Sequence, residues 1–579
     1  MSGDDNDFTV RPGRVRDGGA ASGGRSRKLA AQVRRAAARA GHARRAARPG
    51  RGGTGRFGRG RSAALRARFA RDRRRVVVKA RVVRHHGVRY RAAPLARHVA
   101  YLERDGVTRN GRDASLFDRH GDAADGDAFA ERCEEDRHHF RFIISPEDAG
   151  DMADLRAFTR ELMDDMAKDL DTALDWVAVD HWNTDNPHVH VLVRGRAADG
   201  TDLVIDRDYI REGLRARAEE RVTVELGPRS EREIAAALGR EVDADRWTSL
   251  DRQLQRMADD ADGLVDLRPG GPDPDRRSLL LGRAARLERL GLADRVAPAC
   301  WTLRPAFEQN LRDLSVRTDI IKTMHRAMGH IDRGADPSAF AIEPDAPTDP
   351  IIGRLVERGL HDELAGTAYA VIDGADGRTH HVRFHELDLT GDAPAGAIVE
   401  VRRWTDRRGD VRLSLATRSD LTLEQQVTAP GATWLDRQLV GREPVATAGG
   451  FGHDIRKAIA RRADHLVAEG LARRAGHGVV PEPGLIETLK ARDVGTAAAR
   501  LATVFDLPHR PSVPGEHVSG IYRERVILAS GRFAMIDDGL GFQLVPWRPA
   551  LDAHLGQHVT GTMGPGGAVA WTLGRGIGR

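Results

Sequence analysis

The stretch His181-Trp-Asn-Thr-Asp-Asn-Pro-His188-Val-His190 carries turn-forming residues between two apolar, strand-like runs, residues 175–180 and 189–193. Side chains alternate between the two faces of a strand, so His188 and His190 point to the same side. A hairpin folds the first run back alongside the second and brings His181 opposite this pair. The stretch therefore predicts a β-hairpin that gathers three imidazoles on one face of a sheet.

Three imidazoles in this arrangement indicate a metal site. Neutral imidazole is the commonest metal ligand, and three of them leave coordination positions open for substrate or water. By softness a set of three nitrogens suits Mn, Zn, Co or Ni, whereas Mg prefers oxygen ligands. The alternative is that these are ordinary core or surface residues, because the chain has 23 histidines. The spacings typical of metallo-hydrolase clusters and of cupins do not follow His190.

The sequence around the hairpin predicts an α+β domain over residues 76–228, with an antiparallel sheet and helices on one face. Patterns of strand type lie at residues 75–84, 139–145, 176–182 and 188–194. Ser145 and Pro146 predict a helix start, with Ser145 as the N-cap, and apolar residues at helical spacing from Met152 to Leu170 predict its core face. A second helix is predicted over residues 208–223.

Positive charge is concentrated at the start of the chain. Residues 1–75 hold 22 Arg or Lys against 5 Asp, whereas the net charge of the whole chain is only +7. A segment of this composition buries too little apolar surface to fold alone, and clustered Arg is favoured on phosphate backbones through counterion release. We expect a disordered basic arm that binds DNA. The alternatives are a solvated tail and a general bias of the chain toward arginine.

Beyond residue 228 the sequence predicts four further parts. They are a helical part over residues 229–345, a small β-rich domain over 346–425, a helical segment over 426–505 and a small β domain over 506–579. Residues 279–304 resemble half of a winged helix, with a helix, a turn that contains glycine and a wing strand. Such a module either binds DNA or only packs. The Gly-x4-Gly-Lys-Ser/Thr motif is absent, which argues against a fused helicase.

A tyrosine upstream of the hairpin adds a second motif. Tyrosine is scarce, with five in the chain, and one of them begins Tyr101-Leu-Glu-Arg-Asp-Gly106. Tyr-Leu-x-Arg-x-Gly followed by His-x6-His-x-His resembles the relaxase, or mobilisation nuclease, family of HUH endonucleases. The resemblance is to the MobP branch, which includes the VirD-type relaxases. It covers residues 76 to about 228, and the part beyond resembles an uncharacterised C-terminal extension of some MobP-type relaxases.

The resemblance implies an HUH-type antiparallel sheet with packed helices and the activity of a metal-dependent DNA relaxase. Such an enzyme nicks and rejoins one strand at an origin of transfer and so initiates conjugative plasmid transfer. Tyr101 would attack a phosphodiester to give a 5′-phosphotyrosine and a free 3′-hydroxyl, with His181, His188 and His190 holding Mg or Mn. A phenol with a pKa of about 10 needs a base or a cation nearby to become nucleophilic. Expected partners are single-stranded origin DNA, a type IV secretion coupling protein and relaxosome accessory proteins.

Several assignments stay open. Many relatives have Asp where this chain has Asn183, and Tyr90 or His98 are alternative nucleophiles. Carboxylates that could partner a ligand histidine or Tyr101 are Glu134, Glu135, Asp136, Asp180 and Asp185, although Asp180 should point away from His181 in a regular strand. Another HUH enzyme, a replication initiator or transposase, would carry a Tyr-x3-Tyr helix or histidines before the tyrosine. A non-catalytic accessory protein that binds origin DNA is the third class.

The cysteine content and the hydropathy of the chain indicate the cellular compartment. Cys133 and Cys300 lie far apart without ligand-like neighbours, which favours a reducing compartment and no disulfide framework. No apolar run approaches the length of a membrane span, and no signal-peptide pattern opens the chain. We expect a cytoplasmic protein without a membrane partner.

Overall fold

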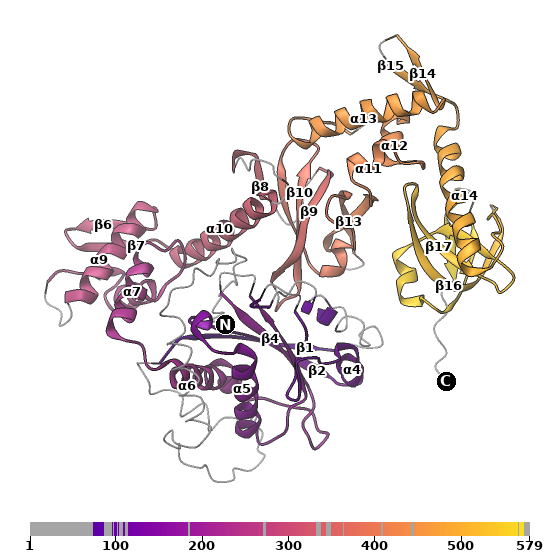
Figure 1. Cartoon of the computed structure of the whole chain (residues 1–579). Helices are drawn as coiled ribbons and strands as arrows, with labels where there is room; N and C mark the ends of the chain where they lie inside the picture. Colours follow the sequence, from indigo (N-terminus) through magenta and orange to yellow (C-terminus); the bar gives the residue numbers. More distant parts are fainter. Residues whose placement is uncertain are drawn as a thin grey trace. The chain divides into compact units, whose positions relative to one another are not determined.

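The computed structural model describes residues 73–85, 95, 98–100, 102–103, 108–110, 114–182, 186–269, 274–329, 331, 337–342, 349–362, 364–406, 409–441, 445–476, 478–513, 515–564 and 567–572. The predicted arm over residues 1–75 therefore lies almost entirely outside the described part. The chain divides into two compact units, Met1–Thr323 and Met324–Arg579. The fold class is α+β, as predicted (Figure 1).

The first unit contains a four-stranded antiparallel sheet. Its strands are β1 (Val76–Arg84), β2 (His138–Pro146), β3 (Trp176–His181) and β4 (His188–Arg194), in the order β1-β2-β4-β3. All four predicted strands are confirmed to within one residue at each end. The β3–β4 hairpin forms one edge of the sheet, and β2 and β4 lie at its centre.

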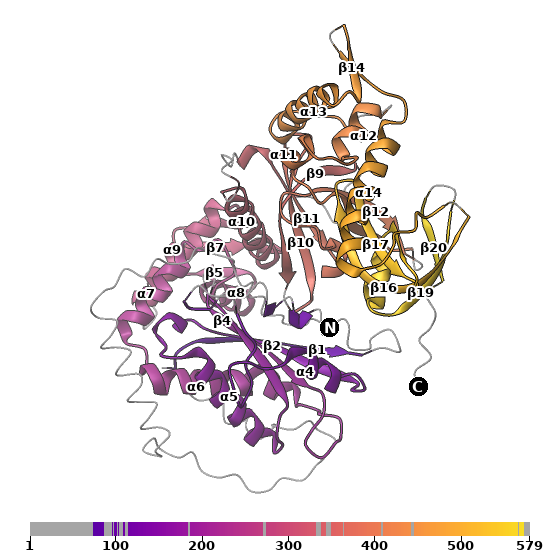
Figure 2. The same ribbon diagram turned by 45° about the vertical axis from the view of Figure 1, so that its right-hand side comes forward.

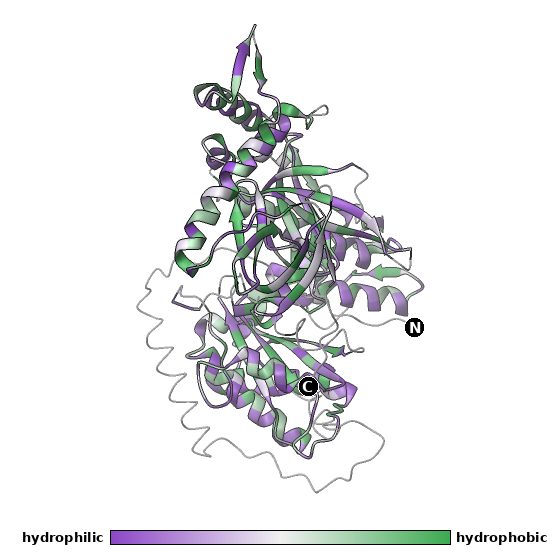
Figure 3. Cartoon of the chain, turned by 90° about the vertical axis from the view of Figure 1, so that its right-hand side faces the viewer, coloured by the Kyte–Doolittle hydropathy of each residue, from purple (hydrophilic) through white to green (hydrophobic). Residues whose placement is uncertain are grey.

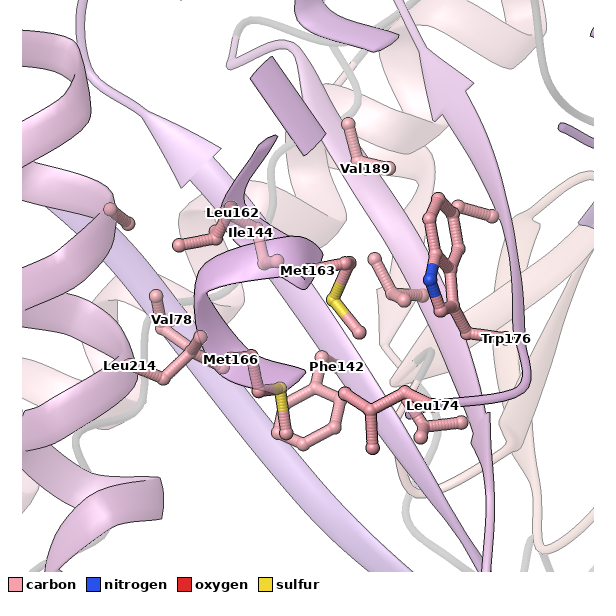
Figure 4. Close-up of a cluster of buried hydrophobic side chains, with 14 of the residues drawn as sticks. Val78, Phe142, Ile144, Leu162, Met163, Met166, Leu174, Trp176, Val189 and Leu214 are labelled. Carbon is pink, nitrogen blue, oxygen red and sulfur yellow. The ribbon is translucent and has the colours of Figure 1, made fainter. Parts of the chain in front are cut away.

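Helices cover one face of this sheet. They are α5 (Leu155–Leu170) and α6 (Leu214–Leu226), the latter preceded by the π-helical turn η3 (Tyr209–Gly213). Their apolar side chains pack against the sheet in one buried cluster, which includes Phe142, Leu162, Met166, Trp176 and Val189 (Figure 4). The predicted core face of the first helix is confirmed, and the second helix ends at Leu226, three residues beyond its predicted end, with Gly227 as its C-cap.

The predicted start of the first helix was wrong. Ser145 and Pro146 are the last residues of β2, and a single 3-10 turn, η2 (Ala149–Asp151), separates them from the helix. The N-cap is Asp154, whose carboxylate accepts from the N–H groups of Arg156 and Ala157 at 2.9 and 3.1 Å. Pro146 is tolerated because it ends the strand, where a missing N–H costs little.

Helical residues also cover the opposite face of the sheet, around a second buried cluster, so the prediction of helices on one face was wrong. Helix α4 (Gly126–Arg132) contributes Phe129, and Leu95, Val99 and Leu102 come from the helical residues before it. They pack against Val177, Val179 and Leu192 of the sheet. Cys133 also lies in this cluster and, like Cys300, is a free buried thiol.

The first unit continues with a module of helices and a hairpin. Its elements are α7 (Glu231–Val242), α8 (Ser249–Asp260), β5 (Leu264–Asp266), α9 (Pro274–Arg289), β6 (Ala293–Ala297) and β7 (Cys300–Leu303), with sheet order β5-β7-β6. The predicted helix, glycine turn and wing strand over residues 279–304 are confirmed in α9, Gly291 and β7. The boundary between the units falls inside α10 (Phe307–Gly329).

The second unit contains two larger sheets and a helical module between them. The first sheet comprises β8 (Phe340–Ile342), β9 (Ile351–Asp362), β10 (Thr367–Gly374), β11 (Thr379–Phe384), β12 (Ile398–Thr405) and β13 (Val411–Ser419), in the order β13-β12-β9-β10-β11-β8. Short 3-10 turns, η4 (Pro337–Ala339) and η5 (Leu387–Thr390), flank its strands.

The helical module and the second sheet complete the chain. The module comprises α11 (Leu423–Val427), α12 (Trp434–Val440), α13 (Phe451–Ala468), β14 (Ala472–Ala475), β15 (Gly478–Pro481) and α14 (Leu485–Phe505). The second sheet comprises β16 (His517–Leu528), β17 (Gly531–Asp537), β18 (Phe542–Pro546), β19 (His558–Met563) and β20 (Val569–Thr572), with η6 (Pro549–His554) before β19. Among the helices that the structure describes, none has both the length and the apolarity to cross a membrane.

Candidate metal centre

The register of the β3–β4 hairpin brings the three predicted histidines together. His181 pairs directly with His188, and His190 pairs with Val179, two residues earlier on β3. The ring centroids lie 5.3 Å apart for His181 and His188, 4.6 Å for His181 and His190, and 4.9 Å for His188 and His190. All three side chains are buried, so a hairpin at the sheet edge holds three imidazoles out of bulk water.

Backbone carbonyls fix two of the rings. Nε2 of His181 lies 3.0 Å from the carbonyl oxygen of Leu102, and Nδ1 of His188 lies 3.0 Å from that of Asn186. A carbonyl can only accept, so each of these nitrogens carries the proton when its ring is neutral. Nε2 of His188 is then a lone-pair nitrogen, and it lies 3.1 Å from Nε2 of His190.

These residues fit a divalent transition-metal ion. One potential ligand nitrogen from each histidine lies within 4.8 Å of the other two, and no other group of three His, Cys, Asp or Glu side chains in the described residues meets that criterion. Backbone carbonyls that orient ligand imidazoles through the second ring nitrogen are a usual feature of metal sites. The three imidazoles could therefore hold a metal ion in a buried place.

The predicted nucleophile lies outside the described residues, as does Tyr90. The residue that follows Tyr101 in the sequence is described: Leu102 is buried, and its carbonyl oxygen is the one that contacts His181. His98, the other alternative nucleophile, is also buried in this segment. Leu95, Val99 and Leu102 pack on the sheet face that carries the histidines, and of these Leu102 contacts the triad through its carbonyl.

Basic side chains share that sheet face, and they were not among the site residues predicted from the sequence. Directly paired residues of antiparallel strands lie on the same face. His190 pairs with Ile143, which pairs with Lys79, and two residues along Arg141 pairs with Arg81. Lys79, Arg81 and Arg141 therefore share the face of His190. Their alternate spacing in the predicted strands was the signal that could have found them.

Arg141 is held by a pair of histidines. Its Nε donates to Nε2 of His139 at 3.1 Å, and Nδ1 of His139 lies 2.7 Å from Nε2 of His85. Burial, helped by the charge of Arg141, holds the pKa of His139 well below its usual range. Burial also lowers the pKa of His85. Neutral rings let His139 accept from the guanidinium, so these two histidines position Arg141.

Of the carboxylates named from the sequence, those that the structure describes do not gather at the triad. Asp180 accepts from Nε of Arg156 at 2.8 Å and from the indole of Trp182 at 2.7 Å, consistent with its predicted direction away from His181. Asp136 is bound by Arg194 at 2.7 Å. Glu134 and Glu135 are exposed in a turn after α4. Asn183 and Asp185 lie outside the described residues.

One family model matches the chain, over residues 280–412 and 403–579, and it is described as "Protein of unknown function (DUF3363)". The matches span more than half of the chain. The chain belongs to the DUF3363 family. The DUF3363 match begins inside α9, so it does not include the histidine triad or the sheet that carries it. No curated protein and no solved structure matches the chain.

Proposed function

We propose that this protein is a metal-dependent DNA relaxase, which nicks and rejoins one strand at an origin of transfer and so initiates conjugative transfer. The observation that carries the proposal is the buried triad of His181, His188 and His190, with His181 in contact with the residue that follows Tyr101. The order of the two motifs and a four-stranded antiparallel sheet packed with helices support it. The proposed fold type within the α+β class is that of the HUH endonucleases.

The proposed reaction is a transesterification. The phenol oxygen of Tyr101 forms a bond to phosphorus, the bond from phosphorus to the 3′-oxygen breaks, the phenol loses its proton and the 3′-oxygen gains one. One phosphodiester replaces another, so the 3′-hydroxyl can attack the phosphotyrosine and rejoin the strand. A divalent ion, Mg or Mn by the resemblance, would supply positive charge to the scissile phosphate.

The chain's own residues have distinct tasks in this proposal. The three imidazoles hold the ion, and the carbonyls of Leu102 and Asn186 orient two of them. Lys79, Arg81 and Arg141 would contact backbone phosphates of the bound strand, which gives affinity without reading sequence. Expected partners are single-stranded origin DNA, a type IV secretion coupling protein and relaxosome accessory proteins, in the cytoplasm.

Covalent capture from a random library tests this function, because the library need not contain a chosen origin sequence. The full chain is incubated with Mn or Mg and random single-stranded DNA, denatured, and the captured strands and the modified residue are identified. We expect a metal-dependent adduct on Tyr101 that is lost in Tyr101→Phe and in His188→Ala. His120→Ala, at an exposed histidine, is the matched control and should keep the adduct.

The other outcomes separate the alternatives. An adduct on Tyr90 or His98 would keep the activity and correct the nucleophile. An adduct that persists in Tyr101→Phe would contradict the assignment of Tyr101. Specific binding of single strands without any adduct, in a protein that still binds Mn, would contradict the relaxase and indicate an accessory protein that binds origin DNA.

A further inference from the structure

Two buried arginines far apart in the sequence make the same five hydrogen bonds. Nε of Arg283 donates to Asp251 at 2.7 Å, and Nε of Arg462 donates to Asp436 at 2.7 Å. The Nη2 groups donate to the second oxygens of the same carboxylates, both at 2.9 Å. The remaining bonds go to carbonyl oxygens at matching positions, those of Val242, Ala244 and Arg246 in one case and of Val427, Ala429 and Gly431 in the other.

The sequence around the two aspartates repeats as well. Thr248-Ser-Leu-Asp-Arg-Gln-Leu254 and Thr433-Trp-Leu-Asp-Arg-Gln-Leu439 differ at one position. In both, the threonine caps a helix and the aspartate completes a capping box. After each arginine follow a left-handed glycine, Gly291 or Gly470 with φ of 70° and 71°, a β-hairpin and a long helix. The order α8-α9-β6-β7-α10 thus recurs as α12-α13-β14-β15-α14.

The repeat extends through the sheets that follow. The strand order β13-β12-β9-β10-β11 of the first sheet recurs as β20-β19-β16-β17-β18 in the second. At the same place in each, a glycine N–H donates to the residue before a bulge: Gly396 to Leu355 at 2.8 Å, and Gly556 to Tyr522 at 2.7 Å. Residues 231–419 and 423–572 are therefore two copies of one architecture, here called the first and second copy.

The copies differ in charge on the exposed face of the helix before the hairpin. In the second copy, α13 exposes His453, Arg456, Lys457 and Arg461, which share one helix face at spacings of three and four residues. The equivalent positions of α9, counted from the matched arginines, are Pro274, Arg277, Ser278 and Gly282. On the hairpin, exposed Arg473 and Arg474 replace Asp294 and Arg295. The second copy thus exposes basic residues on both the helix and the hairpin, here called the basic stripe, within which Arg474 pairs with the exposed Asp464 of α13 at 2.7 Å.

Ion pairs increase the difference in exposed positive charge between the two copies. In the first copy Arg289 lies 3.8 Å from Asp243, Arg295 lies 3.0 Å from Glu288, and Arg304 bonds to Asp294. In the second copy some cations are paired too, including Arg461 with Glu424. Lys457 and Arg473, however, form no ion pair with any residue that the structure describes. Two cations, one on the helix and one on the hairpin, are thus available for a polyanion.

We propose that α13 and the β14–β15 hairpin of the second copy form a binding surface for duplex DNA. The major groove admits one α-helix, and a basic hairpin beside it can contact the flanking phosphates. Figures 1 and 2 show the hairpin extending beyond α12 and α13, and Figure 3 shows one of its strands hydrophilic and the other hydrophobic. Non-specific single-strand binding uses aromatic stacking platforms, and the described exposed residues of this surface include no Phe, Tyr or Trp. The proposal does not depend on the nuclease activity.

Salt dependence of binding tests this surface. The full chain binds a fluorescent duplex of arbitrary sequence, and anisotropy gives the affinity over a series of KCl concentrations. Lys457→Ala/Arg473→Ala should weaken binding and lower the slope of log K against log salt by about 2, since each phosphate contact contributes about 0.9. The matched control, Arg289→Ala/Arg295→Ala, removes the same charge from the first copy and should leave the slope unchanged.

Three results would overturn the proposal: an unchanged slope in Lys457→Ala/Arg473→Ala, an equal fall in the control, or equal competition by single-stranded DNA of the same length. The adduct assay described above separates the two proposals. Lys457→Ala/Arg473→Ala should form the tyrosine adduct at the unsubstituted rate, and a protein that forms no adduct at all would leave the duplex measurement intact.

Discussion

Replacing Arg462 by Met should loosen the helical module of the second unit far more than replacing its neighbour Arg461. The side chains of Arg462 and Asp436 are both 0 % exposed, and the guanidinium satisfies the carboxylate and three backbone carbonyls. Met keeps most of the volume and removes every donor. The substitution leaves the buried carboxylate of Asp436 without a countercharge, although Thr433 still donates to it, and removes the side-chain donor from three carbonyls.

The free-energy cost of Arg462→Met follows from the contacts that are lost. Removing one member of a buried ion pair costs about 3–5 kcal/mol, because the remaining charge stays buried without compensation. At about 1.36 kcal/mol per factor of ten, this is a change of roughly two to three and a half orders of magnitude in the opening equilibrium. Arg461, with 57 % of its side chain exposed, pairs with Glu424 at the surface. Such a pair contributes about 0–1 kcal/mol.

Native-state hydrogen exchange measures these openings locally, which suits a chain with more than one compact unit. Amides of α13 should lose at least about 100-fold of their protection in Arg462→Met, and less than about tenfold in Arg461→Met. Arg283→Met should produce the same loss in α9 of the first copy, since its bonds are the same. Equal, small effects at Arg461 and Arg462 would refute the reasoning.

Two further predictions concern the second unit. Burial lowers the pKa of His381 from 6.5 to about 3. Between these two pH values the unfolded chain binds the proton and the folded chain does not. The free energy of unfolding therefore falls by about 1.4 kcal/mol for each unit that the pH is lowered. Urea unfolding across pH should show this slope reduced in His381→Gln and kept in the exposed control His385→Gln; equal slopes in all three proteins would disprove it. A Cβ at Gly353 or Gly520 would collide with a carbonyl oxygen of the neighbouring strand, so Gly353→Ala and Gly520→Ala should each lower the thermal stability. A Cβ at Gly495 in α14 meets no atom within 4 Å. Gly495→Ala should therefore stabilise the protein by up to about 1 kcal/mol. A neutral effect at Gly353 would count against the close approach.

The hairpin could be predicted from sequence because period and turn chemistry agree there. Alternation in residues 188–194 and the cluster of turn residues before His188 fix both the strands and their register. The register then determines that His181 faces His188, which the structure bears out. Local pattern was sufficient because the three residues belong to adjacent strands joined by a short turn.

The helix start after β2 shows where local pattern fails. Ser145-Pro146 has the chemistry of a helix N-terminus, but pairing with β1 extends the strand through both residues, Ser145 opposite Val77 and Pro146 opposite Val76. A contact with a strand about 70 residues earlier in the chain outweighs a local preference, and no window around Ser145 contains that information. The basic face of Lys79, Arg81 and Arg141 was missed for a related reason, since it exists only once the strands pair.

The duplication was visible in the sequence and was not found there. Its signal is the heptapeptide that begins at Thr248 and again at Thr433, and a search for internal repeats would have detected it. The other shared features, the carbonyls around the two arginines and the sheet order, are properties of the backbone and leave little trace in residue identity. Both copies keep the capping box and the buried arginine because these side chains satisfy backbone groups that the module buries in either copy.

A comparison of the two copies distinguishes residues that the fold requires from residues that it does not require. Positions that agree between them, such as Arg283 and Arg462, satisfy buried polar groups and explain the fold. Positions that differ between the copies do not have to satisfy the same buried polar groups. The strand pairing matches Tyr369 of β10 with Phe533 of β17, so one sheet buries a hydroxyl where the other buries an apolar ring. The basic stripe of α13 and its hairpin belongs to this second class. Because the shared skeleton holds both modules without it, the stripe is not needed for folding, and its charge is best explained by a partner outside the chain.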